Sequence, residues 1–164
     1  MRTRSITTFV AAALLCGLAS VAVAQTPPPQ YGPNVTHEQA RKAIAGAVAD
    51  ARKQNLPMAI AVVDTSGQLM AFERMDGTQI GSVAVSQDKA ASAALYRRPT
   101  KVFQDALAGG GAGLRILTLR GANAVEGGIP LTAADGKIIG AIGVSGGSAE
   151  QDGVVAKAGM DAMK

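Results

Sequence analysis

One segment of this sequence combines residues that could bind an anion. At Val144-Ser-Gly-Gly-Ser148 an apolar run ends in glycines, and a helical pattern begins at once. Backbone N–H groups at the start of a helix favour a bound carboxylate or phosphate. Ser148 and Gln151 have the spacing of a capping box, which would satisfy part of these N–H groups from within the chain. The segment is therefore either an anion site or a tight strand-to-helix turn without a ligand.

Two arginines and one imidazole are further candidates. Arg97 and Arg98 stand at the end of a predicted helix, where the helix dipole favours cations with or without a ligand. Their functional interpretation is a clamp for an anionic group. His37 is the only histidine and Cys16 the only cysteine, so the chain lacks the three or four ligands of a Cys/His zinc site. We expect His37 to be exposed on the first turn of the first helix.

The N-terminal residues 1–24 predict a secretory signal. Arg2 and Arg4 precede an apolar stretch, and Ala22-Val-Ala24 has the small residues of a cleavage site. After cleavage the chain would keep no thiol and no membrane anchor, and we expect it in the periplasm or secreted. Two of the 16 basic side chains are lost with the signal, which leaves a formal net charge of +2 against the 12 acidic ones. Charge therefore gives no argument for a nucleic-acid partner.

The remaining residues predict a leader and one α+β domain. The leader 25–35 is rich in proline and uncharged, so we expect it to be extended and flexible. The domain, 36–164, should be an antiparallel sheet with helices packed against it. The glycine run 109–113 indicates a flexible connector, because no Gly-Lys-Ser/Thr follows it as in a phosphate loop. The predicted helices cover 36–55, 80–96, 100–108 and 148–163, and the predicted strands cover 58–63, 68–74, 114–119 (an edge strand), 127–132 and 137–144.

Four motifs follow one another along this domain. They are Ala61-Val-Val-Asp-Thr-Ser-Gly-Gln-Leu-Met-Ala-Phe-Glu-Arg-Met-Asp-Gly77, Asp88-Lys-Ala-Ala-Ser-Ala-Ala-Leu-Tyr-Arg-Arg-Pro-Thr100, Gly127-Gly-Ile-Pro-Leu131, and Gly136-Lys-Ile-Ile-Gly-Ala-Ile-Gly-Val-Ser-Gly146 with Gln151-Asp152. Together they resemble the GlcG/HbpS family of haem-binding (haem-degrading-domain) proteins. The resemblance runs from about Thr36 to Met163, nearly the whole chain after the signal.

The resemblance implies a small α+β domain, often likened to the profilin fold, that forms homo-oligomers and binds haem. Its polar motif positions that could line a common pocket are Arg98, Thr100, Ser145, Gly146 and Asp152. Arg97 and Arg98 could pair with the haem propionates. The iron ligand would come from His37, Tyr31 or Tyr96, or from the methionines 58, 70, 75, 160 and 163.

Two functional hypotheses follow. The first is an exported, homo-oligomeric haem-binding protein that works in haem or iron handling and needs no catalytic turnover. The alternative is an enzyme or accessory subunit that acts on a small anionic metabolite, held by the Ser145–Ser148 turn and the arginine pair. A third interpretation is an oligomeric interaction module without a small ligand.

Overall fold

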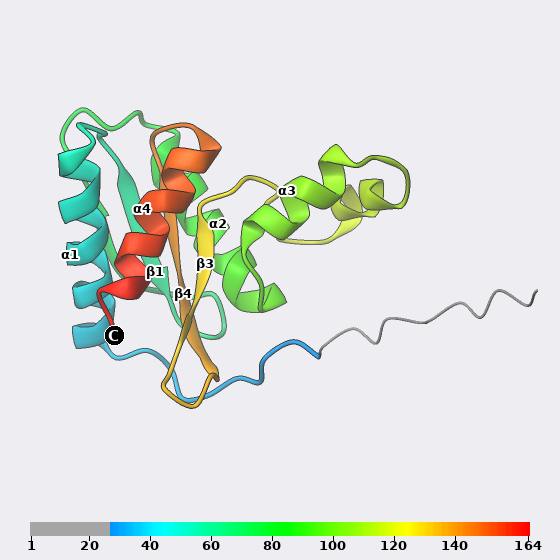
Figure 1. Cartoon of the computed structure of the whole chain (residues 1–164), viewed down its shortest axis with the longest axis horizontal. Coiled ribbons are helices and arrows are strands. Elements are labelled where there is room, and N and C mark those ends of the chain that lie inside the picture. Colours follow the sequence, from blue (N-terminus) through cyan, green and yellow to red (C-terminus); the bar gives the residue numbers. More distant parts are fainter. Residues whose placement is uncertain (1–26) are drawn as a thin grey trace, which may run out of the picture.

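The computed structural model describes residues 27–164 (Figure 1). The predicted signal, 1–24, and the first residues of the leader lie outside the described part. The elements are α1 (His37–Lys53), β1 (Ala59–Val63), β2 (Leu69–Arg74), α2 (Ser82–Tyr96), α3 (Thr100–Ala108), the 3-10 helix η1 (Gly111–Thr118), β3 (Gly128–Thr132), β4 (Ile138–Ser145) and α4 (Ala149–Asp161). In this part of the chain no helix is both long enough and apolar enough to span a membrane.

Two hairpins build the sheet, as the turn residues predict. The strand order is β2-β1-β4-β3, and every neighbouring pair is antiparallel. In the first turn the Asp64 carboxylate accepts the N–H groups of Ser66 and Gln68, at 2.8 and 2.9 Å. In the second turn the Asp135 carboxylate accepts the N–H of Lys137 at 3.1 Å. The predicted α+β class with an antiparallel sheet is confirmed.

Helices cover both faces of the sheet. On one face α1 and α4 lie side by side and pack on Ile60, Val62, Ile142 and Val144 (Figure 1). On the other face α2 packs on the alternate residues of the same strands, such as Ala61 and Ala141. Because both faces are covered, every residue of β1 and β4 is buried, which is why these strands read as continuous apolar runs.

Glycine brings α2 unusually close to β4. A Cβ atom on Gly143 would overlap the Ser86 carbonyl oxygen and lie 2.5 Å from the Ala90 nitrogen, both in the backbone of α2. Alanines complete this inner face of α2, where Ala90, Ala93 and Ala94 are fully buried. The close approach decides how far a long side chain from α2 can reach past the sheet.

The leader is attached to the domain over its second half. Strand β4 extends past the end of β1, which pairs only as far as Ala141. The free backbone groups of Ile138 accept from Gly32 at 2.8 Å and donate to Gln30 at 2.9 Å, and Tyr31 forms a parallel bridge with Ile138. The Tyr31 hydroxyl also donates to the Ala94 carbonyl, at 2.9 Å. The expected flexible leader therefore differs from the structure from Gln30 onward, because β4 offers it hydrogen-bond partners.

A projecting arm replaces one predicted strand. Residues 114–119 are not an edge strand: residues 114–118 belong to η1, Leu119 directly follows it, and η1 extends with α3 away from the sheet (Figure 1). Gly110 and Gly111 have positive φ angles of 63° and 52° and turn the chain out of α3. Within the arm, Ile116 is buried, with 6% of its surface exposed, whereas Leu117 is 72% exposed. The prediction failed because a 3-10 helix repeats its apolar residues about every three positions, which a short run cannot distinguish from a strand.

Substitution Gly143→Ala tests the close approach of α2 to β4. The added methyl overlaps helix backbone, which cannot move aside alone, so the free energy of unfolding should fall by about 1–3 kcal/mol or more. Chemical denaturation followed by circular dichroism measures the change. Gly81→Ala is the control, because a Cβ there meets no atom within 4 Å. Equal stability of the two variants would refute this packing.

Candidate functional site

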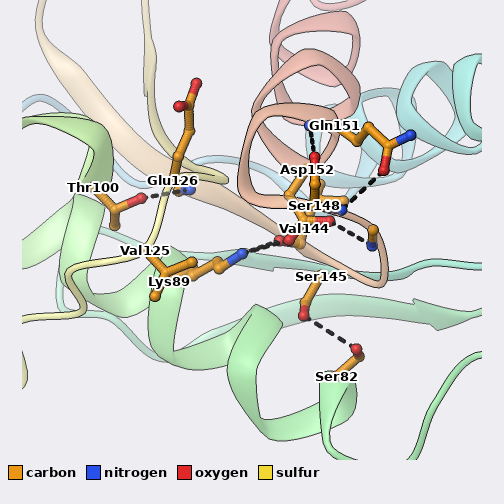
Figure 2. Close-up of polar contacts among 12 residues, drawn as sticks. Ser82, Lys89, Thr100, Val125, Glu126, Val144, Ser145, Ser148, Gln151 and Asp152 are labelled. Atoms are coloured by element: carbon orange, nitrogen blue, oxygen red, sulfur yellow. Dashed lines mark hydrogen bonds and ion pairs between the residues drawn. The ribbon is translucent and has the colours of Figure 1, made fainter. Parts of the chain in front are cut away.

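A buried ion pair links α2 to α4. Lys89 leaves the inner face of α2, and its Nζ donates to the Asp152 carboxylate at 2.6 Å and to the Val144 carbonyl at 3.1 Å (Figure 2). The two side chains are only 1% and 4% exposed. A charged group in the interior needs this kind of partner, since an isolated buried charge would cost several kcal/mol.

The second oxygen of Asp152 holds the strand-to-helix turn. It accepts the N–H of Gly147 at 2.9 Å. Burial raises the pKa of the Asp152 carboxyl, and the hydrogen bonds from Lys89 and Gly147 act in the opposite direction. The carboxylate thus lies where the sequence predicted a bound anion.

Two further N–H groups at this turn also have acceptors within the chain. Ser148 N–H donates to the Gln151 side chain at 2.9 Å, and Gln151 N–H donates to the Ser148 hydroxyl at 3.3 Å, so the predicted capping box is confirmed (Figure 2). Gly146 lies against the Pro57 backbone with no room for a side chain. The Ser145 hydroxyl donates to that of Ser82, at 3.1 Å. The turn is therefore filled by its own side chains, and the anionic-metabolite hypothesis loses this support.

Thr100 lies close to the ion pair, but its side chain forms a hydrogen bond with the backbone. Its hydroxyl accepts the N–H of Gly128 at 2.9 Å. A Cβ on Gly128 would overlap both the Lys89 carbonyl and the Thr100 side chain. Thr100, Ser145, Gly146 and Asp152 are thus gathered around Lys89, as a packed interior and not as an open pocket.

The two arginines lie away from this cluster. The Arg97 guanidinium lies over the Tyr31 ring at 5.3 Å and donates to the Pro29 carbonyl at 3.3 Å, so it holds the leader. The Arg98 guanidinium lies over the Phe103 ring at 5.8 Å, at the base of the arm. The expected common pocket of arginines and turn residues is not formed. Arg97 contacts Tyr31, which pairs with Ile138 at one end of β4, whereas Ser145 lies at the other end of this strand.

Lys89 was not among the predicted site residues, although the sequence contains a signal for it. Ser82, Ser86, Lys89 and Ala93 follow one another at helical spacing on the buried face of α2. A lysine on such a face must find a buried partner, and Asp152 is 63 residues away. Helical periodicity predicts the burial of Lys89, but it cannot identify the partner.

His37 lies in a different place, in a groove between α1 and the edge strand β2. The groove has a volume of about 390 Å³ and is lined by His37, Arg41, Ile44, Ala45, Ala71, Phe72 and Glu73. His37, Arg41 and Ala45 lie on one face of α1 because they are four residues apart. As expected, His37 is exposed. Within residues 27–164 neither His37 nor Arg41 takes part in a salt bridge, so both are available to a ligand.

Comparison with known proteins shows the family. Residues 35–161 match the family model described as haem degrading protein HbpS-like. The chain belongs to the HbpS-like family. It is 40% identical over 111 residues to protein GlcG of Escherichia coli K12, covering 68% of this chain and 81% of GlcG.

Two solved structures of this kind are also similar to the chain. HbpS of Streptomyces reticuli, crystallised as a double mutant, superimposes with a TM-score of 0.71 at 30% identity, over 92% of this chain and 97% of that one. The PduOC:heme complex superimposes with a TM-score of 0.70 at 26% identity, over 79% of this chain and 94% of that one.

Substitution of Lys89 tests the buried ion pair. Lys89→Met should lower the free energy of unfolding by about 3–5 kcal/mol, because it leaves the Asp152 carboxylate buried without its cation. The double variant Lys89→Met, Asp152→Leu should recover part of this loss in urea denaturation. Lys137→Met removes an exposed pair with Asp135 and should leave stability nearly unchanged. A Lys89→Met protein as stable as the parent would show that the pair is not formed.

Proposed function

We propose that this protein is exported and binds haem in the groove between α1 and β2, as a binding protein in haem or iron handling. The observation that carries the proposal is that one groove combines an exposed imidazole, an arginine that has no salt-bridge partner within residues 27–164, and the apolar residues Ile44, Ala45 and Ala71. Imidazole is a common haem ligand, and a guanidinium pairs well with a carboxylate.

The groove residues fit haem in type. His37 would ligate the iron, Arg41 would pair with a propionate, and Ile44, Ala45 and Ala71 would contact the apolar macrocycle, while the Glu73 carboxylate lines the same groove. Haem when bound would supply the iron chemistry. The chain's own contribution is a ligand, a compensating charge and an apolar surface.

The other candidate ligands are less suited to iron. The Tyr31 hydroxyl donates to the Ala94 carbonyl at 2.9 Å and the Tyr96 hydroxyl to the Arg120 carbonyl at 2.8 Å. Met58 is fully buried in the core. Met160 and Met163 line a separate cavity without His37 or Arg41. Met70 and Met75 are partly buried and pack against the core, so His37 remains the best candidate.

Family membership supports the same proposal. The family model is described as haem degrading, and PduOC, one structural relative, was solved in a complex with heme. Binding alone accounts for the groove, so the proposal includes no catalytic turnover. The charged start, apolar stretch and Ala22-Val-Ala24 of residues 1–24 support export to the periplasm or beyond, with cleavage before Gln25.

We also propose that the protein is a homo-oligomer. The projecting arm supports this, because Leu114 and Leu117 are 52% and 72% exposed and Val102, on α3 of the same arm, is 45% exposed. Apolar side chains gathered on a projecting segment are typical of an interface with another protein chain. A second copy would cover them.

Haem titration of the exported protein tests the first proposal. Mass spectrometry establishes whether the purified chain begins at Gln25, and haemin is then added while the Soret band is followed. A saturable shift at micromolar haemin is expected, and His37→Ala should abolish the shift because the iron loses its ligand. Arg41→Gln should weaken binding by about three- to tenfold through loss of a charge-assisted hydrogen bond.

A matched variant controls for nonspecific binding. Met160→Leu, in the separate cavity, should titrate like the parent protein. If His37→Ala retains the shift while Met160→Leu loses it, the ligand is on α4 and the groove proposal fails. If the parent shows no saturable shift, haem binding itself is refuted.

Substitution Leu117→Glu tests the arm as an interface. A charge at the centre of an apolar contact would prevent association, so light scattering after gel filtration should give the mass of a single chain. Val154→Glu is the control, because Val154 is 55% exposed on α4, outside the arm. An unchanged oligomeric mass for Leu117→Glu would place the interface elsewhere, and a monomeric parent protein would contradict the proposal.

A further inference from the structure

A second cavity lies on the opposite flank of the same helical layer. The groove of His37 lies between α1 and the edge strand β2, whereas this cavity lies between the end of α4 and the turn that joins β3 to β4, at the other edge of the sheet. Its volume is about 440 Å³, within the usual range for a small-molecule site. It is lined by Leu131, Thr132, Ala133, Ala134, Met160, Met163 and Lys164.

The lining of this cavity is mostly apolar, and part of it consists of flexible methionine side chains. Leu131 is fully buried and forms part of the wall. Met160, in the last turn of α4, and Met163, just after the end of this helix, both line the cavity. Methionine side chains adjust their shape readily and make favourable contacts with aromatic rings. The strand register also shifts between Leu131 and Thr132, an irregularity that commonly re-aims side chains next to binding sites.

The charges around the cavity favour an uncharged ligand. Lys164 is the only charged residue of the lining, and its ammonium group lies 2.7 Å from the Asp161 carboxylate. Asp161 also pairs with Lys157. Unlike Arg41 in the groove of His37, Lys164 is paired with a carboxylate and is 74% exposed to solvent. A propionate or phosphate would therefore gain little from this cation.

We infer that this cavity is a second binding site, separate from the proposed haem groove, for a small uncharged molecule with a flat apolar ring. Ring faces would contact the two methionine side chains and Ala133, and Thr132 at the rim would tolerate one polar atom. The inference does not depend on haem binding.

Methionine methyl NMR of the exported protein tests the inference, with indole as the probe. The signals of Met160 and Met163, assigned through Met→Leu variants, should shift saturably with indole, while those of Met58, Met70 and Met75 remain in place. Indole-3-acetate, of similar shape but charged, should bind about tenfold more weakly or not at all, because its carboxylate would be desolvated without a partner. The response should persist in His37→Ala, so this inference and the haem proposal can fail independently.

A filled cavity provides the complementary experiment. Ala133→Phe should abolish the response to indole, and Ala134→Phe, closer to the surface, serves if the first variant does not fold. Ala84→Phe, on the exposed side of α2, is the matched control and should respond like the parent. The inference is overturned if Met160 and Met163 do not respond at the solubility limit of indole, if all methionines shift alike, or if the charged probe binds as well.

Discussion

The buried contact between Lys89 and Asp152 is the constraint on which the arrangement around β4 depends. Lys89 belongs to the helix on one face of the sheet and Asp152 to a helix on the other, and both also hydrogen-bond to the end of β4 or the turn that follows it. Removing one partner would leave an uncompensated charge in the interior, so the two helices must keep their positions together. Gly127 is part of the same constraint, because a Cβ there would lie 2.9 Å from the Lys89 ammonium nitrogen.

This constraint has a consequence for function. The turn before α4 has the form of an anion site, but the Asp152 carboxylate occupies it from within. The side chains of Thr100 and Ser145 are likewise used in packing, and Arg97 holds the leader. Two surfaces that remain open lie at the outer flanks of the α1 and α4 layer, one with an imidazole and an arginine and one with two methionines. The polar residues that the sequence suggested for one pocket are thus used inside the chain, and the two open flanks are lined by other residues.

The elements that could be predicted are those stabilised by neighbours in the chain. The capping box at Ser148 and both hairpin turns depend on contacts within about four residues, and all of them are present. The predictions failed where a distant partner decided the outcome. Residues 114–119 curl against α3 instead of joining the sheet, the leader binds the free end of β4, and the arginines face Tyr31 and Phe103.

The sequence by itself therefore determined the α+β class, the order of most helices and strands and the family, because these depend on local periodicity, turn chemistry and ordered motifs. It also identified His37 as the one imidazole. Only the tertiary structure decided that Ala71 of β2 stands beside His37 and Arg41 of α1, and that Lys89 meets Asp152. Those contacts join residues that are far apart in the chain. A short stretch of sequence does not encode which distant side chains the packing of the sheet will bring together.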